Sequence, residues 1–166
     1  SPVVSEDKST NKISEAEITD RLKKAETDVI EILVPQISEE KEIEIVLSQN
    51  SINSISESDR IEKLKILTSV ATIELDKSAI DGIKNQSSSD ISIVMKKCDE
   101  DDLTEEQKTR AGSSPVYKFE IDSNGNTISN LNGTATVTVD YVPEIDEDLN
   151  LIKVFYIEKD GSLAEI

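Results

Sequence analysis

The sequence predicts a mainly β fold, in which sandwich-like antiparallel sheets are joined by connections that hold about three short helices. Short runs of alternating apolar and polar residues recur along the chain, as is typical of strands with one buried face. About nine such runs follow at intervals of roughly ten residues, which favours a sandwich. Most segments between the runs are too short for the helices that parallel strands need as connections.

Size and composition favour one folded, acidic domain. The 166 residues include 35 Asp and Glu against 18 Lys and Arg, a formal net charge of -17. Hydrophobic residues still make up 36% and recur periodically, unlike those of a disordered acidic chain. We expect a flexible linker over residues 1–12 and a single domain over residues 13–166. The negative field opposes nucleic acid and anionic membranes, so neither is expected as a partner.

Cysteine content and hydropathy exclude several further classes. Cys98 is the only cysteine, so there is no intramolecular disulfide, and its neighbours indicate a cysteine at the end of a strand. No apolar stretch reaches about 18 residues, and we predict no membrane insertion. The polar start "SPVVSEDKSTNK" reads as a linker rather than a targeting segment.

The first half of the chain mixes helical and strand signals. Residues 13–28 have apolar positions three and four apart, and Ser14 with Glu17 forms a capping-box pattern, which predicts an amphipathic helix. The runs "TDVIEILVP" and "EKEIEIVLS" predict two strands with a polar connection, the first ended by Pro35.

The middle of the chain continues this alternation. Ile52 and Ile55 stand three apart in a polar segment, which predicts one or two helical turns. "IEKLKILTSVATIELD" predicts a hairpin, followed by a helical segment capped by Asp76 and by the strand "DISIVMKKCD".

The last third is nearly all β. A capping pattern at Thr104 and a helix-ending Gly112 come first. Asn124-Gly125 then predicts a hairpin turn, and a final hairpin is expected around Asp160-Gly161. Residues 151–157 carry apolar side chains on both faces, which predicts a strand inside the core.

The order of these pieces resembles a known type of module. The similar segments are "EIEIVLSQNSINSI", "ATIELDKSAIDGI", "DEDDLTEEQKTRAGSSPVYKFEI", "TATVTVDYVP" and "LIKVFYIEKDGSLAEI". Together they resemble an extracellular β-rich module of clostridial and related Gram-positive surface proteins that carry S-layer homology repeats. The likeness extends from about residue 13 to residue 166. It lies in the overall pattern, since none of these motifs is diagnostic alone.

The resemblance implies a structural or interaction module on the bacterial surface, and it supplies no catalytic residues. Members of this family usually continue with another strand that ends in a His-Phe-Ser-like segment, whereas this chain has no histidine. The departure leaves open whether a closing strand is missing.

Catalytic chemistry has little support in the sequence. Carboxylates are numerous enough for an acid/base pair, but aromatic residues are 3% of the chain and tryptophan is absent, which argues against a glycan-cleaving site. The lack of histidine excludes Ser-His-Asp and Cys-His nucleophiles. Phosphate-binding motifs are also missing. We therefore predict no enzyme, no catalytic residue and no cofactor.

Three acidic clusters offer the oxygen ligands that calcium prefers. They are Asp99, Asp101 and Asp102; Asp122, Asn124 and Asn126; and Glu144, Asp146 and Asp148. The second has the spacing of half a calcium loop, but Gly133 stands where a bidentate Glu is needed, and a hairpin turn explains Asn-Gly. We predict a turn and two solvated loops, and no metal site.

Two functions follow from these observations. The first is a non-catalytic structural or spacer module of an extracellular cell-surface protein, whose partners are the neighbouring domains of the same polypeptide. The alternative is a module that binds wall or extracellular polysaccharide or a surface protein, which a groove floored by Tyr117, Tyr141 or Tyr156 would favour. A regulatory or autoprocessing module is a weaker third interpretation, because such a module needs a strained bond that can be cleaved, and the sequence indicates none.

Overall fold

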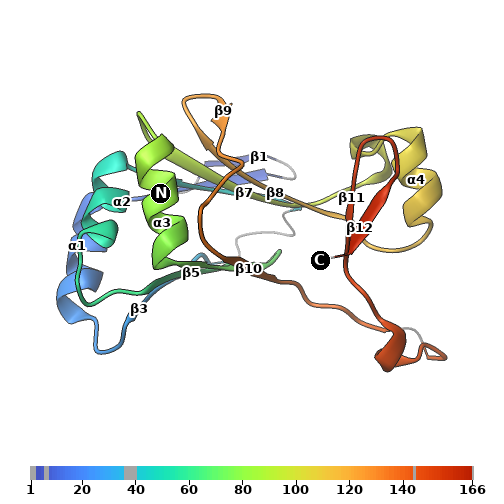
Figure 1. Cartoon of the computed structure of the whole chain (residues 1–166), viewed down its shortest axis with the longest axis horizontal. Coiled ribbons are helices and arrows are strands. Elements are labelled where there is room, and N and C mark those ends of the chain that lie inside the picture. The colour runs from blue at the N-terminus through green and yellow to red at the C-terminus, as the bar shows by residue number, and fades with distance from the viewer. Residues whose placement is uncertain (1–2, 6–7, 36–40, 144, 166) are drawn as a thin grey trace. The chain divides into compact units, whose positions relative to one another are not determined.

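A computed structural model describes residues 3–5, 8–35, 41–143 and 145–165 (Figure 1). Its Cα packing divides the chain into two compact units. The larger comprises the chain up to Lys96 together with Phe119–Val139, and the smaller comprises Lys97–Lys118 and the chain from Asp140 onward. Where the sequence predicts one domain over residues 13–166, the structure therefore has two compact units.

The larger unit is rich in strands. Its elements are β1 (Val3–Ser5), β2 (Lys8–Ile13), α1 (Glu15–Lys24), β3 (Val29–Leu33), β4 (Glu42–Leu47), α2 (Gln49–Ser56), β5 (Lys63–Leu67), β6 (Thr72–Asp76), α3 (Lys77–Gln86), β7 (Ile91–Lys97), β8 (Tyr117–Ser123), β9 (Asn126–Thr127) and β10 (Ala135–Thr138). The outermost residues of β7 and β8 belong to the smaller unit.

These strands form two sheets. One has the order β1-β2-β4-β7-β8-β9 and the other the order β10-β6-β5-β3. The prediction of antiparallel sheets is wrong in part, because β2 pairs with β4, and β3 with β5, in parallel. The cause is the path of the chain: from β2 it crosses through α1 to β3 in the other sheet, then returns to β4, which therefore runs in the same direction as β2. Short helices thus suffice for parallel pairing when they connect two sheets.

The sequence predicts a flexible linker over residues 1–12, whereas the structure has strand β2 over Lys8–Ile13. All six of its residues are in register with β4, and Ser9 and Asn11 are buried on the face that apolar residues usually occupy. Asn11 Nδ2 donates to Ser9 Oγ at 3.3 Å, so these two polar side chains are bonded to each other. A strand with polar residues at its buried positions gives no alternating apolar signal.

The three helices of the larger unit begin with the same local structure. Each N-cap side chain accepts a hydrogen bond from the backbone N–H three residues later, as predicted for Ser14 and Asp76. The cap and donor pairs are Ser14 and Glu17, Ser48 and Ser51, and Asp76 and Ala79. The second half of the predicted Ser14 capping box is not formed, since the Glu17 carboxylate accepts hydrogen bonds from Arg21 instead.

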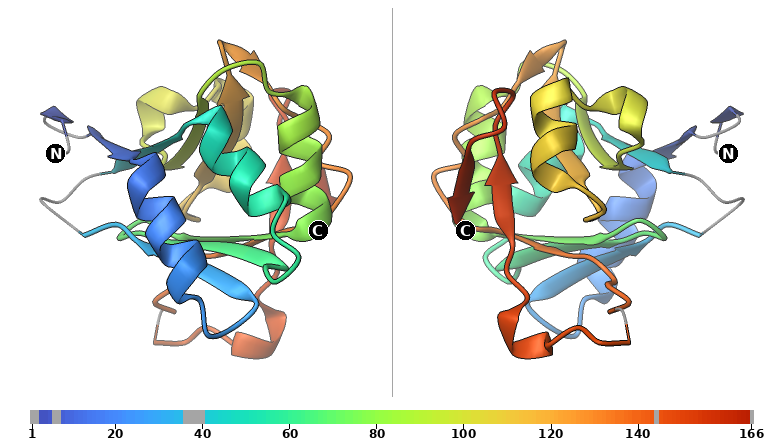
Figure 2. Two further views of the ribbon diagram at one scale, coloured as in Figure 1. Left: turned by 90° about the vertical axis from the view of Figure 1, so that its left-hand side faces the viewer. Right: turned by 90° about the vertical axis from the view of Figure 1, so that its right-hand side faces the viewer.

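A buried apolar pair accompanies each cap. The residue before the cap and the fourth helical residue are both buried, in the pattern of a hydrophobic staple. The pairs are Ile13 and Ile18, Leu47 and Ile52, and Leu75 and Ile80. Figure 2 (left) shows the three helices together on one side of the larger unit.

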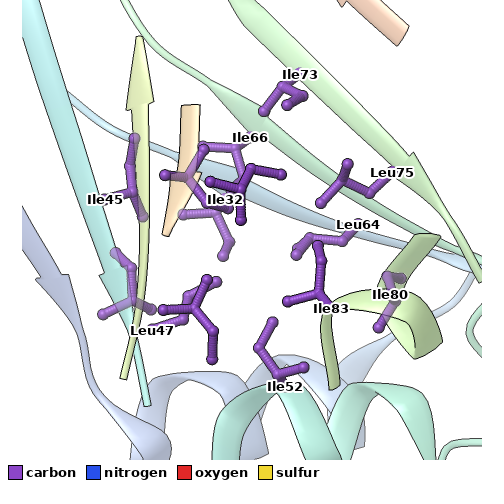
Figure 3. Close-up of a cluster of buried hydrophobic side chains, with 14 of the residues drawn as sticks. Ile32, Ile45, Leu47, Ile52, Leu64, Ile66, Ile73, Leu75, Ile80 and Ile83 are labelled. Atoms are coloured by element: carbon purple, nitrogen blue, oxygen red, sulfur yellow. The ribbon is translucent and has the colours of Figure 1, made fainter. Parts of the chain in front are cut away.

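The core is a single cluster built mostly of isoleucine. Strands of both sheets and the helices contribute to it, as Figure 3 shows for Ile32, Ile45, Ile52 and Ile80. The predicted hairpin of β5 and β6 is confirmed, and so is the buried face of β7, which consists of Ile91, Ile93 and Met95. β-Branched side chains suit pleated, buried surfaces, which accounts for their dominance here.

The smaller unit holds η1 (Glu100–Asp102), α4 (Glu105–Ala111), η2 (Leu149–Leu151), β11 (Phe155–Ile157) and β12 (Leu163–Glu165). The capping box at Thr104 and the positive-φ Gly112 are confirmed at the ends of α4. This helix brings the α-helices of the described residues to four, so the predicted count of about three is too low.

The final hairpin does not supply the predicted core strand. β11 pairs with β12 in a two-stranded sheet, and its turn contains Gly161 at φ 77°, so the hairpin itself is confirmed. Its apolar side chains remain substantially exposed: Phe155 is 43% and Tyr156 56% accessible. A strand with apolar residues on both faces is buried only where other elements cover both faces. Whether they do so is decided by the tertiary structure.

A close contact fixes α3 to the loop before β10. Asp76 Oδ2 accepts from the Thr134 N–H at 3.0 Å, and the Asp76 N–H donates to Thr134 O at 3.1 Å. At Gly82 an added Cβ would lie 1.9 Å from the carbonyl oxygen of Leu131, and at Gly133 it would lie 2.2 Å from the Ala79 nitrogen. Both glycines are therefore required by close approach of two backbones.

We predict that Gly82→Ala destabilises the larger unit. Alanine is the better helix former by about 1 kcal/mol, but its Cβ would collide with Leu131, so a net loss of about 2 kcal/mol is expected. Urea unfolding followed by circular dichroism measures the difference. The matched control is Ser54→Ala on the exposed side of α2, which should change the free energy of unfolding by less than about 0.5 kcal/mol. Equal stability of the two variants would contradict the close contact.

Candidate functional site

The acidic clusters singled out in the sequence have structural uses. Asp122 and Asn126 flank the β8–β9 hairpin, whose loop residues Asn124 and Gly125 have φ values of 53° and 75°, so the predicted turn is confirmed. In the first cluster the Asp102 carboxylate accepts from the Asp99 N–H at 2.9 Å.

The third cluster is used in the same way. Asp148 accepts from the Asn150 N–H at 3.0 Å at the start of η2. Beside it, Tyr141 Oη donates to the Glu147 carboxylate at 2.7 Å, while Asp146 is exposed and Glu144 lies outside the described residues. Within the described part of the chain, no three carboxylate or cysteine side chains gather as metal ligands.

The remaining candidate residues belong to different elements of the chain. Cys98 follows directly after β7 as predicted, and its N–H donates to Val116 O at 2.9 Å. Of the tyrosines, Tyr117 opens β8, Tyr141 lies in the loop after β10, and Tyr156 lies in β11. In the Asn132-Gly133-Thr134 glycosylation pattern, Asn132 has φ 55° and Gly133 and Thr134 contact the start of α3.

Charged side chains with shifted pKa values hold strands and helix ends together. A hydrogen bond to Glu42 raises the pKa of Lys8, and one from Ser92 lowers the pKa of Glu44, across β2, β4 and β7. On the other sheet, a hydrogen bond to Glu74 at 2.8 Å raises the pKa of Lys63. Lys8 pairs with Glu44 at 3.1 Å on one sheet and Lys63 with Glu74 at 2.8 Å on the other, so the shifted groups form separate cross-strand pairs.

Asp76 is the ionisable group with the most specific surroundings. The Ala79 N–H at 2.8 Å, and then the Thr134 N–H, donate to its carboxylate and lower its pKa. One side chain thus caps α3 and ties the chain before β10 to the end of β6. The Asp76 carboxylate therefore holds these two segments in position, because both of its oxygens accept hydrogen bonds from backbone N–H groups.

Two open grooves lie on the larger unit. One, of about 450 Å³, is lined by Glu15, Ser48, Gln49, Asn50, Ser89 and Asp90. Its polar groups bond to one another: Ser48 Oγ donates to Glu15 Oε1 at 2.8 Å, and Asn50 Nδ2 donates to the same oxygen at 3.1 Å. The groove therefore offers an incoming ligand few unused groups.

The second groove is larger, about 820 Å³, and runs between α1 and β3. Its walls are Glu17, Asp20, Arg21, Lys24 and Ala25 on the helix side and residues 27–31 on the strand side. Arg21 Nη1 donates to the carbonyl oxygen of Glu31 at 2.5 Å, which links the two walls. This groove lies beside the open edge of a sheet, because within the described part of the chain β3 pairs only with β5. It is the best candidate binding site on the larger unit.

Sequence reasoning missed this groove. The run "TDVIEILVP" predicts a strand, but nothing in it says which strand lies beside it or that one edge stays open. The parallel pairing of β3 with β5 decides both. Neither groove is lined by Tyr117, Tyr141 or Tyr156, so the feature that would favour a polysaccharide-binding module is absent from these two grooves.

Comparison of the chain with protein-family models, with curated proteins and with solved structures found no match. In the described residues, no helix is both long enough and apolar enough to cross a membrane.

We predict that the free energy of unfolding depends on pH through Asp76. The folded-state pKa lies below its ordinary value of 3.8, so the stabilising contribution is complete above that pH and is lost as the pH falls through the folded-state pKa. Asp76→Asn keeps one oxygen for the cap and loses the charge and an acceptor, which should cost about 1 kcal/mol at pH 7. Urea unfolding over a pH series measures both effects.

The matched control is Asp59→Asn, which replaces an exposed carboxylate outside any cap. It should leave stability unchanged at every pH. A deficit of the Asp76→Asn variant that persists undiminished in acid would show that the carboxylate charge contributes nothing.

We also predict that calcium changes thermal stability only weakly. The carboxylates of these clusters that the structure describes are engaged in turns and caps or are exposed, and among them no cluster offers the six to eight oxygens that the ion requires. Melting curves with calcium and with chelator should coincide within a few degrees. A rise of more than about 10 °C would identify a calcium site that involves these loops.

Proposed function

We propose that this protein is a non-catalytic structural or spacer module of a bacterial cell-surface protein. In this proposal the two sheets of the larger unit act as a sandwich-like scaffold outside the cell, and the module joins or presents neighbouring domains of the same polypeptide. The resemblance to modules near S-layer homology repeats supports the location, and the polar, cross-paired sheet faces support the role.

The observation that carries the proposal is the use of the ionisable side chains. The charged groups with shifted pKa values connect adjacent strands, cap helices or close turns. An enzyme site instead places shifted groups together in a cleft. The isoleucine core and the three stapled helices add rigidity, which a spacer needs and a catalyst does not specifically require.

The alternative is a module that binds wall polysaccharide or a surface protein. Between these ligands, the groove beside β3 favours a protein, because a strand edge presents backbone groups that another chain can pair with. Saccharide sites rely on aromatic platforms, and the walls of this groove contain none.

The spacer proposal predicts resistance to force. Placed between two reference domains in a single-molecule pulling experiment, the chain should unfold in discrete steps, each releasing about 3.5 Å per residue. The Gly82→Ala variant should unfold at lower force and Ser54→Ala at unchanged force. Gradual extension without a discrete step would contradict a spacer, and turnover of a wall polymer that one carboxylate substitution abolishes would contradict a non-catalytic module.

A further inference from the structure

Among the residues that the structure describes, strand β3 has one edge without a neighbouring strand. On the β5 side, the Asp28 carbonyl accepts from the Glu62 N–H at 2.7 Å, and the Val34 N–H donates to Leu67 O at 2.9 Å. Peptide groups alternate in direction along a strand, so Val29, Glu31 and Leu33 direct their N–H and C=O groups to the open edge.

This edge is only partly satisfied by the chain itself. Thr27 Oγ1 contacts the N–H and the C=O of Val29, both at 3.3 Å, and Arg21 occupies the carbonyl of Glu31. The described residues provide no partner for the Glu31 N–H or for either backbone group of Leu33. Unpaired groups in a row are the template for another strand.

The groove beside the edge, of about 820 Å³, has a charge preference. Three of its four carboxylates have a cation of their own: Glu17 has Arg21 at 2.8 Å, Asp20 has Lys24 at 2.8 Å, and Glu31 has Lys65 at 3.3 Å. Asp28 interacts electrostatically with Lys63, but the described residues offer it no cation at ion-pairing distance. An incoming positive charge would therefore be favoured at the start of β3.

Apolar surface lies along the same path. The groove lining includes the partly exposed Ala25 and Val29, and at the far end of the strand the Leu33 side chain is 69% exposed. A chain that lies along β3 would cover this surface with alternate side chains, because successive residues of a strand point to opposite faces.

We propose that the open edge of β3, with the groove against α1, binds an extended segment of a partner protein as an additional strand. The segment alternates apolar residues with Lys or Arg: its backbone pairs with Glu31 and Leu33, and a cation meets Asp28. A second copy of this chain is disfavoured as the occupant because each copy carries a net charge of -17. This binding role goes beyond that of a spacer and does not depend on it.

In the free protein, Arg21 blocks part of the open edge of β3. Glu17 holds its guanidinium through contacts at 2.8 and 3.1 Å, and the guanidinium covers the Glu31 carbonyl that the new strand would use. Binding would transfer that carbonyl from Arg21 to a backbone N–H of the partner. Replacing Arg21 with Ala should therefore tighten binding several-fold.

The test uses the full chain and a synthetic decapeptide that alternates Val and Lys. Amide hydrogen exchange by NMR reads out the edge directly. In the free protein the Glu31 and Leu33 amides should exchange fast, while those of Ile30 and Ile32, which face β5, are protected. The peptide should slow exchange at Glu31 and Leu33 by about tenfold or more.

A pair of variants at one position separates backbone pairing from charge. Glu31→Pro removes the outward N–H, which an edge strand tolerates, whereas Glu31→Ala removes the same carboxylate and keeps the N–H. Glu31→Pro should weaken binding about tenfold relative to Glu31→Ala. Asp28→Asn should weaken it less, and a decapeptide that alternates Val and Glu should not bind. Thermal melts confirm folding, and Arg21→Ala carries the test if Glu31→Pro does not fold.

Two outcomes would overturn the proposal, and the first is nonspecific attraction of the basic peptide. The smaller unit is itself acidic, with 14 Asp and Glu against 6 Lys and Arg, and could attract such a peptide by charge alone. Equal affinity of the Pro and Ala variants, with spectral changes spread over acidic surfaces, would show that nonspecific attraction. Protection of Glu31 and Leu33 that rises with protein concentration in the absence of peptide would identify a second copy as the occupant. Neither outcome affects the spacer proposal, which force measurements test separately.

Discussion

The larger unit depends on how a strand passes into a helix. In α1, α2 and α3 an N-cap side chain fixes the first turn, and a buried apolar pair across that cap fixes the direction in which the helix leaves the strand. Each of these helices carries the chain from one sheet to the other. Parallel pairing, the edge position of β3 and the shared core all follow from these crossings (Figures 1 and 3).

Charge has a local and a global role in this protein. Locally, opposite charges face each other across neighbouring strands, as Lys63 and Glu74 do, and carboxylates such as Asp76 serve backbone donors. Globally, the excess of acids sets the sign of any partner that the surface attracts. Asp28 links the two roles, since it lies in a groove whose other carboxylates are paired within the protein.

A larger unit with one shared core and an open strand edge are compatible features. The buried apolar pairs at the helix starts and the pairing with β5 hold β3 in place, so an added strand would meet a preorganised template. Exposed edges carry a risk of unwanted association, which charged residues reduce. Here Arg21 and Glu31 provide that protection, while the backbone groups at Leu33 stay accessible.

The sequence by itself determined the local structures: the caps at Ser14, Asp76 and Thr104, the Asn124-Gly125 turn and the β5–β6 hairpin depend on a few adjacent residues. It could not determine partners distant along the chain. β2 was hidden because its buried positions hold Ser9 and Asn11, and the last hairpin looked like core because nothing local reveals what covers a strand. The candidate groove was out of reach for the same reason, since which strand lies at an edge is decided only when the chain has crossed between the sheets and paired β3 with β5.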